Sequence, residues 1–426
     1  MMVQEPKSPL GAAFCRRRRL TIPKAAIITL FAAAVLLAIA GNFLFFLCKP
    51  SATINHFYGG ENNYERIVTR LRQTGPNVPL EIIAGGNYQW SLLLFPTFAA
   101  IKKLGFSFAA FAMMPALGLL LGLVFSYLIA ARLGGGEIGG WLAAALLALS
   151  PLGSGVARSF NPWSLIIGCY LALTYAAVLY SDRPSAPRAV AVGALVAANL
   201  WCAQAPTTLV VVFFYAVAPL LWCFWRAISE RGLPGRNRAM HLGLMLIPVF
   251  LWFHFIAGST GVGFGYGHFL TDNLNFTSRK HSTLYSLGGY FVAGWCCLLG
   301  PITAVVMLAG LLFYPRRPVN KQHLVWLILP LAALIGFSFV VKKNTWYVLE
   351  SLALLSAVAA VTCAAWLSKL HWTLQLLLCA LLVVALGWQY NFFFHHSFFP
   401  DNGAWLRHYY VETIFTSGTS VAPIFP

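Results

Sequence analysis

The stretch RRRRLTIPKAAIITLFAAAVLLAIAG, Arg16–Gly41, places four arginines directly before a long apolar run. The run has about 23 residues, whereas the apolar core of a cleavable secretory or twin-arginine signal has about 7–15. The sequence therefore predicts an uncleaved first membrane span over 25–47. Because basic residues that stay in the cytoplasm orient a span, we expect residues 1–24 to form a cytoplasmic, basic N-terminus.

The whole chain has the composition of a polytopic membrane protein. Of its 426 residues, 59% are hydrophobic and only 9% are charged, and the mean hydropathy is +0.74. A soluble domain carries about 25% charged residues, so this composition excludes a soluble enzyme. A spanning helix needs roughly 20 apolar residues, which predicts about eleven spans. We expect an all-α bundle with spans at 25–47, 107–131, 138–152, 162–181, 189–204, 207–225, 240–257, 285–313, 323–341, 345–367 and 372–390.

The net charge of +18 raises the question of a nucleic-acid partner. Most of the lysines and arginines, however, fall in the N-terminus and in short loops on the same predicted side of the membrane. Such a distribution orients the spans and attracts anionic lipid, so we expect membrane lipids and no nucleic acid as partners. The nine cysteines show no CxxC spacing, and no His or carboxylate cluster has metal-ligand spacing. We therefore predict no cofactor, and the sequence indicates no divalent-metal site.

The first outer loop, 48–106, is the most polar part of the predicted membrane domain 25–390. Within HFYGGENNYERIVTRLRQTG, His56–Gly75, apolar residues recur at i, i+3, i+4 and i+7 from Tyr64, which predicts an amphipathic helix. A second apolar stretch, Asn87–Gly105, is too short to span and is interrupted by Pro96. We expect two helices parallel to the membrane here.

Glu61 is the candidate catalytic base of this loop. Gly59 and Gly60 permit a sharp entry into the helix, and Glu61 then lies in its first turn, where the helix N-terminus favours an ionised carboxylate. A carboxylate kept charged at the membrane edge suits a general base. The alternative is structural: a lipid-surface anchor in which Glu61 is only a helix cap or one half of an ion pair.

Three stretches resemble the GT-C membrane glycosyltransferases, in particular protein O-mannosyltransferases and bacterial aminoarabinose transferases. They are GGENNYERI at Gly59–Ile67, the stretch Ala130–Leu173 with its Arg-containing turn, Ser-Pro and Arg…Asn-Pro, and KKNTWYVLESLALLSAVAAV at Lys342–Val361. The sequence departs from the family pattern in three places. A single Glu stands for the usual Asp, NYQW replaces a His-Pro-Pro-like element, and Lys342–Lys343 replaces a late Arg.

The resemblance implies a GT-C-like bundle with two interfacial helices in the first outer loop. It also implies transfer of a sugar from a polyprenyl-phosphate donor to an acceptor hydroxyl on the outer side, with inversion and with Glu61 as base. The acceptor is a glycan, a lipid or a protein. The expected location is the plasma membrane, such as a bacterial inner membrane, with an outer tail at 391–426.

Such a reaction needs donors for the leaving phosphate and polar groups for the sugar. Basic residues near outer span ends are the candidates for the phosphate: Arg158, Arg279, Lys280, Lys342 and Lys343. For Arg158 the alternative is interfacial snorkelling. Candidates for substrate binding, with the aromatic interfacial belt and ion pairing as alternatives, are Glu65, Asn87, Tyr88, Trp90, Asn161, Asp272, Tyr347 and Glu350.

Glu350 stands out because it lies inside a predicted span. Lys343, Tyr347 and Glu350 share one helical stripe, and an ionisable residue within a span is a functional candidate by default. The alternative is an ion pair with a neighbouring span. Two other functions compete with transfer. Transport is disfavoured because no repeat is visible and no other acid lies inside a predicted span, whereas a non-catalytic membrane subunit with the transferase fold remains open.

Overall fold

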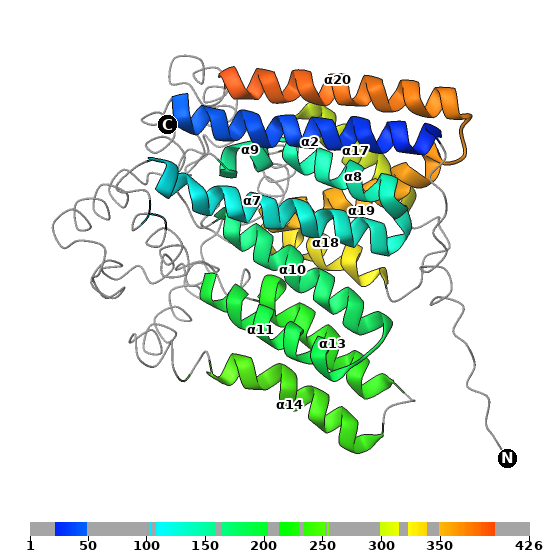
Figure 1. Ribbon diagram of the computed structural model, residues 1–426. Coiled ribbons are helices and arrows are strands. Elements are labelled where there is room, and N and C mark those ends of the chain that lie inside the picture. The colour runs from blue at the N-terminus through cyan, green and yellow to red at the C-terminus, as the bar shows by residue number, and fades with distance from the viewer. Residues whose placement is uncertain are drawn as a thin grey trace.

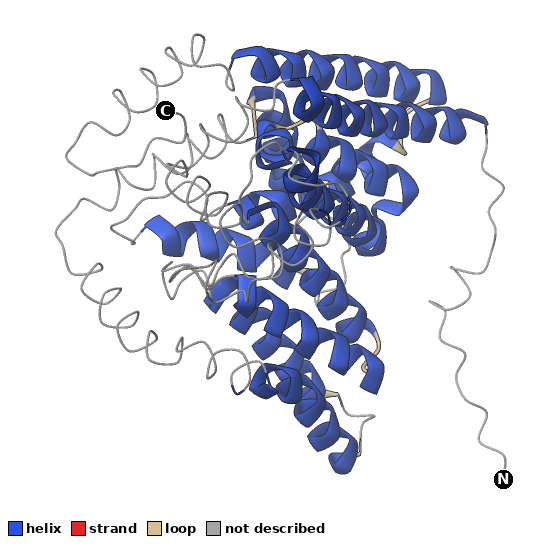
Figure 2. Ribbon diagram, turned by 60° about the vertical axis from the view of Figure 1, so that its left-hand side comes forward, coloured by secondary structure: helices blue, strands red, loops and turns tan. Residues whose placement is uncertain are grey.

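The computed structural model describes residues 22–48, 100, 103, 108–157, 163–202, 213–230, 234–251, 254, 299–314, 323–338 and 349–396. Within these ranges the elements are helices, and none is a strand (Figure 2). They are α2 (Ile22–Cys48), α7 (Phe108–Ala130), η2 (Ala131–Gly135), α8 (Gly136–Ala148), α9 (Pro151–Ala157), α10 (Trp163–Asp182), α11 (Ala186–Cys202), η3 (Phe213–Val217), α13 (Ala218–Ser229), α14 (Gly235–Leu251), α17 (Pro301–Phe313), α18 (Val325–Ser338), α19 (Leu349–Leu367) and α20 (Trp372–His396).

The predicted all-α membrane architecture is confirmed. Each predicted span overlaps a described helix. Among the described residues, five stretches are long and apolar enough to cross a membrane: Pro23–Leu44, Pro115–Ala148, Ser164–Asp182, Leu349–Leu367 and Trp372–Phe392. The chain is therefore a multi-pass membrane protein. The exact number of crossings, the orientation in the membrane and the domain boundaries stay predictions.

Helix α19 forms the centre of the bundle, because almost all of its residues are buried. It packs against α8, α17, α18, α10 and α7. Its sequence is rich in alanine and serine, and small residues let membrane helices approach closely. Helices α2 and α20 lie side by side along one edge of the bundle, and α11, α13 and α14 form the opposite edge (Figure 1).

Helices α7 and α10 make a close backbone contact. A Cβ on Gly118 would come within 2.4 Å of the carbonyl carbon of Ser164, and a Cβ on Gly168 within 2.9 Å of the carbonyl oxygen of Gly118. Gly118 and Gly122 have the GxxxG spacing that allows such packing in membranes. At the far end of α7, Gly134 with φ 107° and Gly136 with φ 60° let the chain reverse into α8.

The described helices end in two groups at opposite ends of the bundle. We call one the arginine end: it holds η2 and the C-terminal ends of α10 and α13, which hydrogen bonds join to one another. The Glu350 end holds the first turn of α19, the start of α17 and the C-terminal part of α20 (Figure 1). The sequence predicts that the arginine end is cytoplasmic and that the Glu350 end is extracytoplasmic.

Candidate functional site

Of the site residues predicted from sequence, the structure describes Glu350. The others lie outside the described residues, so their predicted roles and the two interfacial helices stay predictions: Glu61, Glu65, Asn87, Tyr88, Trp90, Arg158, Asn161, Asp272, Arg279, Lys280, Lys342, Lys343 and Tyr347. The candidate site is therefore built from Glu350 and its described neighbours.

Glu350 lies in the first turn of α19 and is fully buried. Neither oxygen of its carboxylate has a hydrogen-bond partner in the described part of the chain. The amide groups of the helix N-terminus favour a negative charge at this position, but burying a carboxylate without a partner costs several kcal/mol (order of magnitude). The predicted alternative, an ion pair with a neighbouring span, is not found among the described residues.

Two buried tyrosines from other helices, Tyr170 and Tyr215, lie near the start of α19. The Tyr215 hydroxyl shares a hydrogen bond of 2.8 Å with the Ser351 hydroxyl, and the rings of Tyr170 and Tyr215 meet edge to face with centroids 4.9 Å apart. Helices α10, α19 and η3 thus bring one carboxylate and several hydroxyl groups together, a set that suits hydrogen bonding to a polar ligand such as a sugar.

Tyr215 was not predicted from the sequence. It lies in η3, a single π-helical turn at the start of α13, and π-helical turns inside α-helices are frequent at functional sites. The segment FFYAV reads as ordinary span sequence, so no local signal pairs Tyr215 with Ser351, a residue far along the chain.

Gln389 is the most extensively bonded buried side chain at the Glu350 end. Its carbonyl oxygen accepts hydrogen bonds from the backbone N–H of Ile302 at 2.7 Å and of Thr303 at 3.2 Å. Its amide group donates to the Leu299 carbonyl at 3.1 Å and to the Thr303 hydroxyl at 2.9 Å. Gln389 on α20 therefore caps the N-terminus of α17, where Gly300 turns with φ 75°.

The next residue of α20 extends this framework to α2. The single O–H of Tyr390 is shared between two acceptors, the Asn42 side-chain oxygen at 3.1 Å and the Ala38 carbonyl at 3.3 Å. Gln389 and Tyr390 together hold the ends of α2 and α17 that border the Glu350 end.

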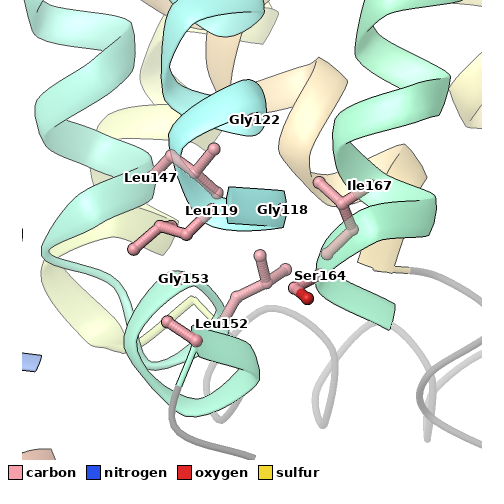
Figure 3. A pocket seen from close by; sticks show the side chains of 9 residues that line it. Gly118, Leu119, Gly122, Leu147, Leu152, Gly153, Ser164 and Ile167 are labelled. Atoms are coloured by element: carbon pink, nitrogen blue, oxygen red, sulfur yellow. The ribbon is translucent and has the colours of Figure 1, made fainter. Parts of the chain in front are cut away.

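A small cavity lies between α7, α8, α9 and α10 (Figure 3). Its volume of about 10 Å³ accommodates at most one water molecule. The lining is apolar apart from Ser164, whose buried hydroxyl has no hydrogen-bond partner among the residues described. The cavity is too small for a sugar or a lipid head, so it is a packing gap. It is lined by Gly118, Leu119, Gly122, Leu147, Leu152, Gly153, Ala157, Ser164 and Ile167.

Within the described ranges, no group of three or more His, Cys, Asp or Glu side chains could hold a metal ion. Among the cysteines in these ranges, Cys223, Cys363 and Cys379 are free thiols.

The helix arrangement matches solved structures. ArnT from Cupriavidus metallidurans bound to undecaprenyl phosphate superimposes with a TM-score of 0.57 and 18% identity over 84% of this chain and 63% of ArnT. The apo structure of the same protein gives a TM-score of 0.52 and 18% identity over 82% of this chain and 61% of ArnT. ArnT is a GT-C aminoarabinose transferase. The chain has the GT-C fold.

The GT-C fold confirms the structural part of the resemblance predicted from sequence. The likeness, at 18% identity, is one of fold, and this chain spans about 63% of the length of ArnT. A fold hosts more than one function, so activity has to be argued from the site. No model of a protein family and no curated protein matches the sequence.

Proposed function

We propose that the protein is a glycosyltransferase that moves a sugar from a polyprenyl-phosphate donor to an acceptor hydroxyl on the extracytoplasmic side of the plasma membrane. The observation that carries the proposal is the GT-C fold, shared with an ArnT structure bound to undecaprenyl phosphate. The buried, unpartnered carboxylate of Glu350 supports it, because an ionisable group inside a membrane span is a functional-site hypothesis by default.

The proposed reaction is a single inverting displacement. The acceptor oxygen attacks the anomeric carbon of the sugar, the bond from that carbon to the phosphate oxygen breaks, and its electron pair leaves with polyprenyl phosphate. Glu61 takes the acceptor proton as general base. Arg158, Arg279, Lys280, Lys342 and Lys343 are the proposed source of donors that stabilise the charge on the leaving phosphate.

Glu350 and the Tyr215 hydroxyl are proposed to bind the sugar. A carboxylate accepts hydrogen bonds from sugar hydroxyls, and a phenol hydroxyl both donates and accepts. A bound sugar would supply partners for the carboxylate oxygens, which have none among the described residues.

The test compares Glu61→Gln with a control of equal charge in the same outer loop, Glu81→Gln. Membranes from the native host, with each variant replacing the chromosomal copy, are analysed by mass spectrometry for glycosylated lipid, polysaccharide and protein. Removing a general base should lower the product about 100-fold or more, whereas Glu81→Gln should leave it within about twofold, since no role in the reaction is proposed for Glu81. An unchanged amount of product in Glu61→Gln would show that Glu61 is not the general base.

A non-catalytic GT-C subunit is the second candidate. One observation favours it: a single Glu followed by Asn62 stands where the family has an Asp, often followed by a second acid. In that case, deleting the chain would abolish a product that Glu61→Gln and Glu350→Gln both leave intact. A transporter would instead move a lipid or sugar across liposome membranes with no new glycosidic bond.

A further inference from the structure

The last turn of α10 connects the helices at the arginine end. Three consecutive residues of that turn each contact a different element. The Tyr180 hydroxyl lies 3.0 Å from Nδ1 of His241 on α14, Ser181 accepts a hydrogen bond from Trp222 on α13 at 2.9 Å, and Asp182 contacts η2. The Asp182 carboxylate pairs with Arg132 at 2.7 Å and with His323 at 2.9 Å. The negative charge of Asp182 is therefore compensated by groups of the protein itself.

The arginines on the α13 side of this turn have far less acidic compensation. Arg226 donates through Nη2 to the Ser181 carbonyl and to the Glu230 carboxylate, each at 3.0 Å. Arg238 donates through Nη2 to the Glu230 carbonyl at 3.0 Å. Arg226 thus meets the carboxylate of Glu230, whereas Arg238 meets only its backbone carbonyl. In this part of the described structure, the Nε–H groups of both arginines are buried and have no acceptor.

Three further arginines lie on the neighbouring turns: Arg183, Arg188 and Arg236. Arg188 donates through Nη1 to the carbonyls of Leu179 and Arg183, each at 2.7 Å, across the α10–α11 turn. Arg236 is exposed in the first turn of α14. Of the ion pairs within the described ranges, those of this region are Arg226–Glu230 and the two made by Asp182. This region thus combines concentrated positive charge with buried N–H donors that have no acceptor among the described residues. Such a combination favours binding of an anionic ligand.

Helix α13 presents an apolar stripe next to this charge. Leu221, Trp225 and Ile228 recur at i, i+4 and i+7 and are 49%, 53% and 58% exposed. Arg226 is adjacent in sequence and is 8% exposed. The Trp225 ring stacks on that of Trp222, with centroids 4.9 Å apart, and tryptophan is enriched where a membrane meets water. The exposed apolar side chains and Arg226 therefore lie on the same part of α13.

We propose that α13 and the turns beside it bind an anionic phospholipid from the leaflet at the arginine end. The lipid phosphate takes the N–H donors of Arg226 and Arg238, with Arg183, Arg188 and Arg236 adding attraction, and an acyl chain lies along Leu221, Trp225 and Ile228. Charge complementarity selects an anionic head over a zwitterionic one. The apolar stripe runs along α13 and offers contacts to an acyl chain, which a free anion lacks. The stripe therefore favours a lipid over a free anion.

The experiment uses the purified full chain in a non-ionic detergent with phosphatidylglycerol, and counts retained lipids by native mass spectrometry. Each arginine near an anionic lipid contributes about 1 kcal/mol, so Arg238→Gln should weaken retention about fivefold. The matched control is Lys369→Gln, an exposed charge in the α19–α20 turn, which should change retention less than twofold. Arg226 is left in place because its bonds join α13 to α10.

Three results would overturn the proposal. Equal losses in Arg238→Gln and Lys369→Gln would show diffuse attraction instead of a site. Equal retention of phosphatidylcholine with the same acyl chains would remove the role of charge. Displacement of phosphatidylglycerol by inorganic phosphate would show a site for a free anion. As a second variant, Trp225→Ala should also weaken retention, and retention unchanged by it would remove the stripe from the proposal.

Discussion

Asp182 and Glu350 are both carboxylates on helices that cross the bundle, yet their surroundings differ. Asp182, at the arginine end, forms an ion pair with Arg132 and accepts a hydrogen bond from His323. Glu350, at the opposite end, is fully buried and has no hydrogen-bond partner in the part of the chain that the structure describes. One carboxylate connects helices, whereas the other makes no hydrogen bond or ion pair among the described residues.

This difference separates structural from functional polar groups. A paired carboxylate in a membrane protein joins the elements that carry its partners, so its removal should cost stability. An unpaired one lowers stability, and its presence therefore points to a role outside folding. Gln389 sharpens the contrast, because it lies at the Glu350 end and is equally buried but is fully bonded.

The largest loss of stability should come from Gln389→Leu. The substitution keeps the volume but leaves the N–H of Thr303 and the carbonyl of Leu299 buried without partners, which should lower the free energy of unfolding by about 3 kcal/mol. Gln375→Leu, on the same helix, removes one hydrogen bond to the Leu370 carbonyl and should cost less than about 1 kcal/mol. Denaturant or thermal unfolding in detergent measures both. Equal losses of unfolding free energy in the two variants would show that the number of hydrogen bonds removed does not determine the loss of stability.

Asp182→Asn should come next, at about 2 kcal/mol. Breaking a partly buried pair leaves Arg132 without its counter-charge, and the Arg132 side chain is 32% exposed, so water replaces part of the interaction. The control is Glu137→Gln, an exposed acid in the first turn of α8, with an expected change within about 0.5 kcal/mol. A stable Asp182→Asn protein would contradict the structural role assigned to this carboxylate.

His323→Gln should have the smallest effect, about 1 kcal/mol, because Asp182 keeps Arg132 as a partner. The double variant Asp182→Asn with His323→Gln tests the pairing itself. Residues in contact are not additive, so the effect of His323→Gln should nearly vanish in the Asp182→Asn background. Additive losses in the same unfolding assay would mean that the two side chains act separately.

Hydropathy and turn residues predicted the helices well, because each span is specified locally. The overlap of α10 and α19 with spans 162–181 and 345–367 follows from apolar length alone. Helix α17 begins at Pro301, and proline suits the first turn of a helix. The GT-C arrangement was reached by resemblance in short motifs, and the fold comparison agrees with it.

The polar contacts could not be predicted in the same way. Gln389 bonds to residues 86–90 positions earlier and Asp182 to His323, 141 positions later. Such pairs depend on which helices become neighbours, and no period or spacing in the sequence encodes that. Glu350 was found because a charge inside an apolar run is visible locally, whereas Tyr215, its neighbour in space, was not.

The central claim is that Glu350 serves the reaction and not the fold. The direct measurement is the amount of glycosylated product per folded protein in Glu350→Gln, by mass spectrometry of host membranes. We predict a free energy of unfolding equal to or above that of the unmodified protein, because a buried unpaired charge is removed, and a product at least about tenfold lower, because substrate contacts are lost. An unchanged product per folded protein, or a loss of stability like that of Asp182→Asn, would contradict the account.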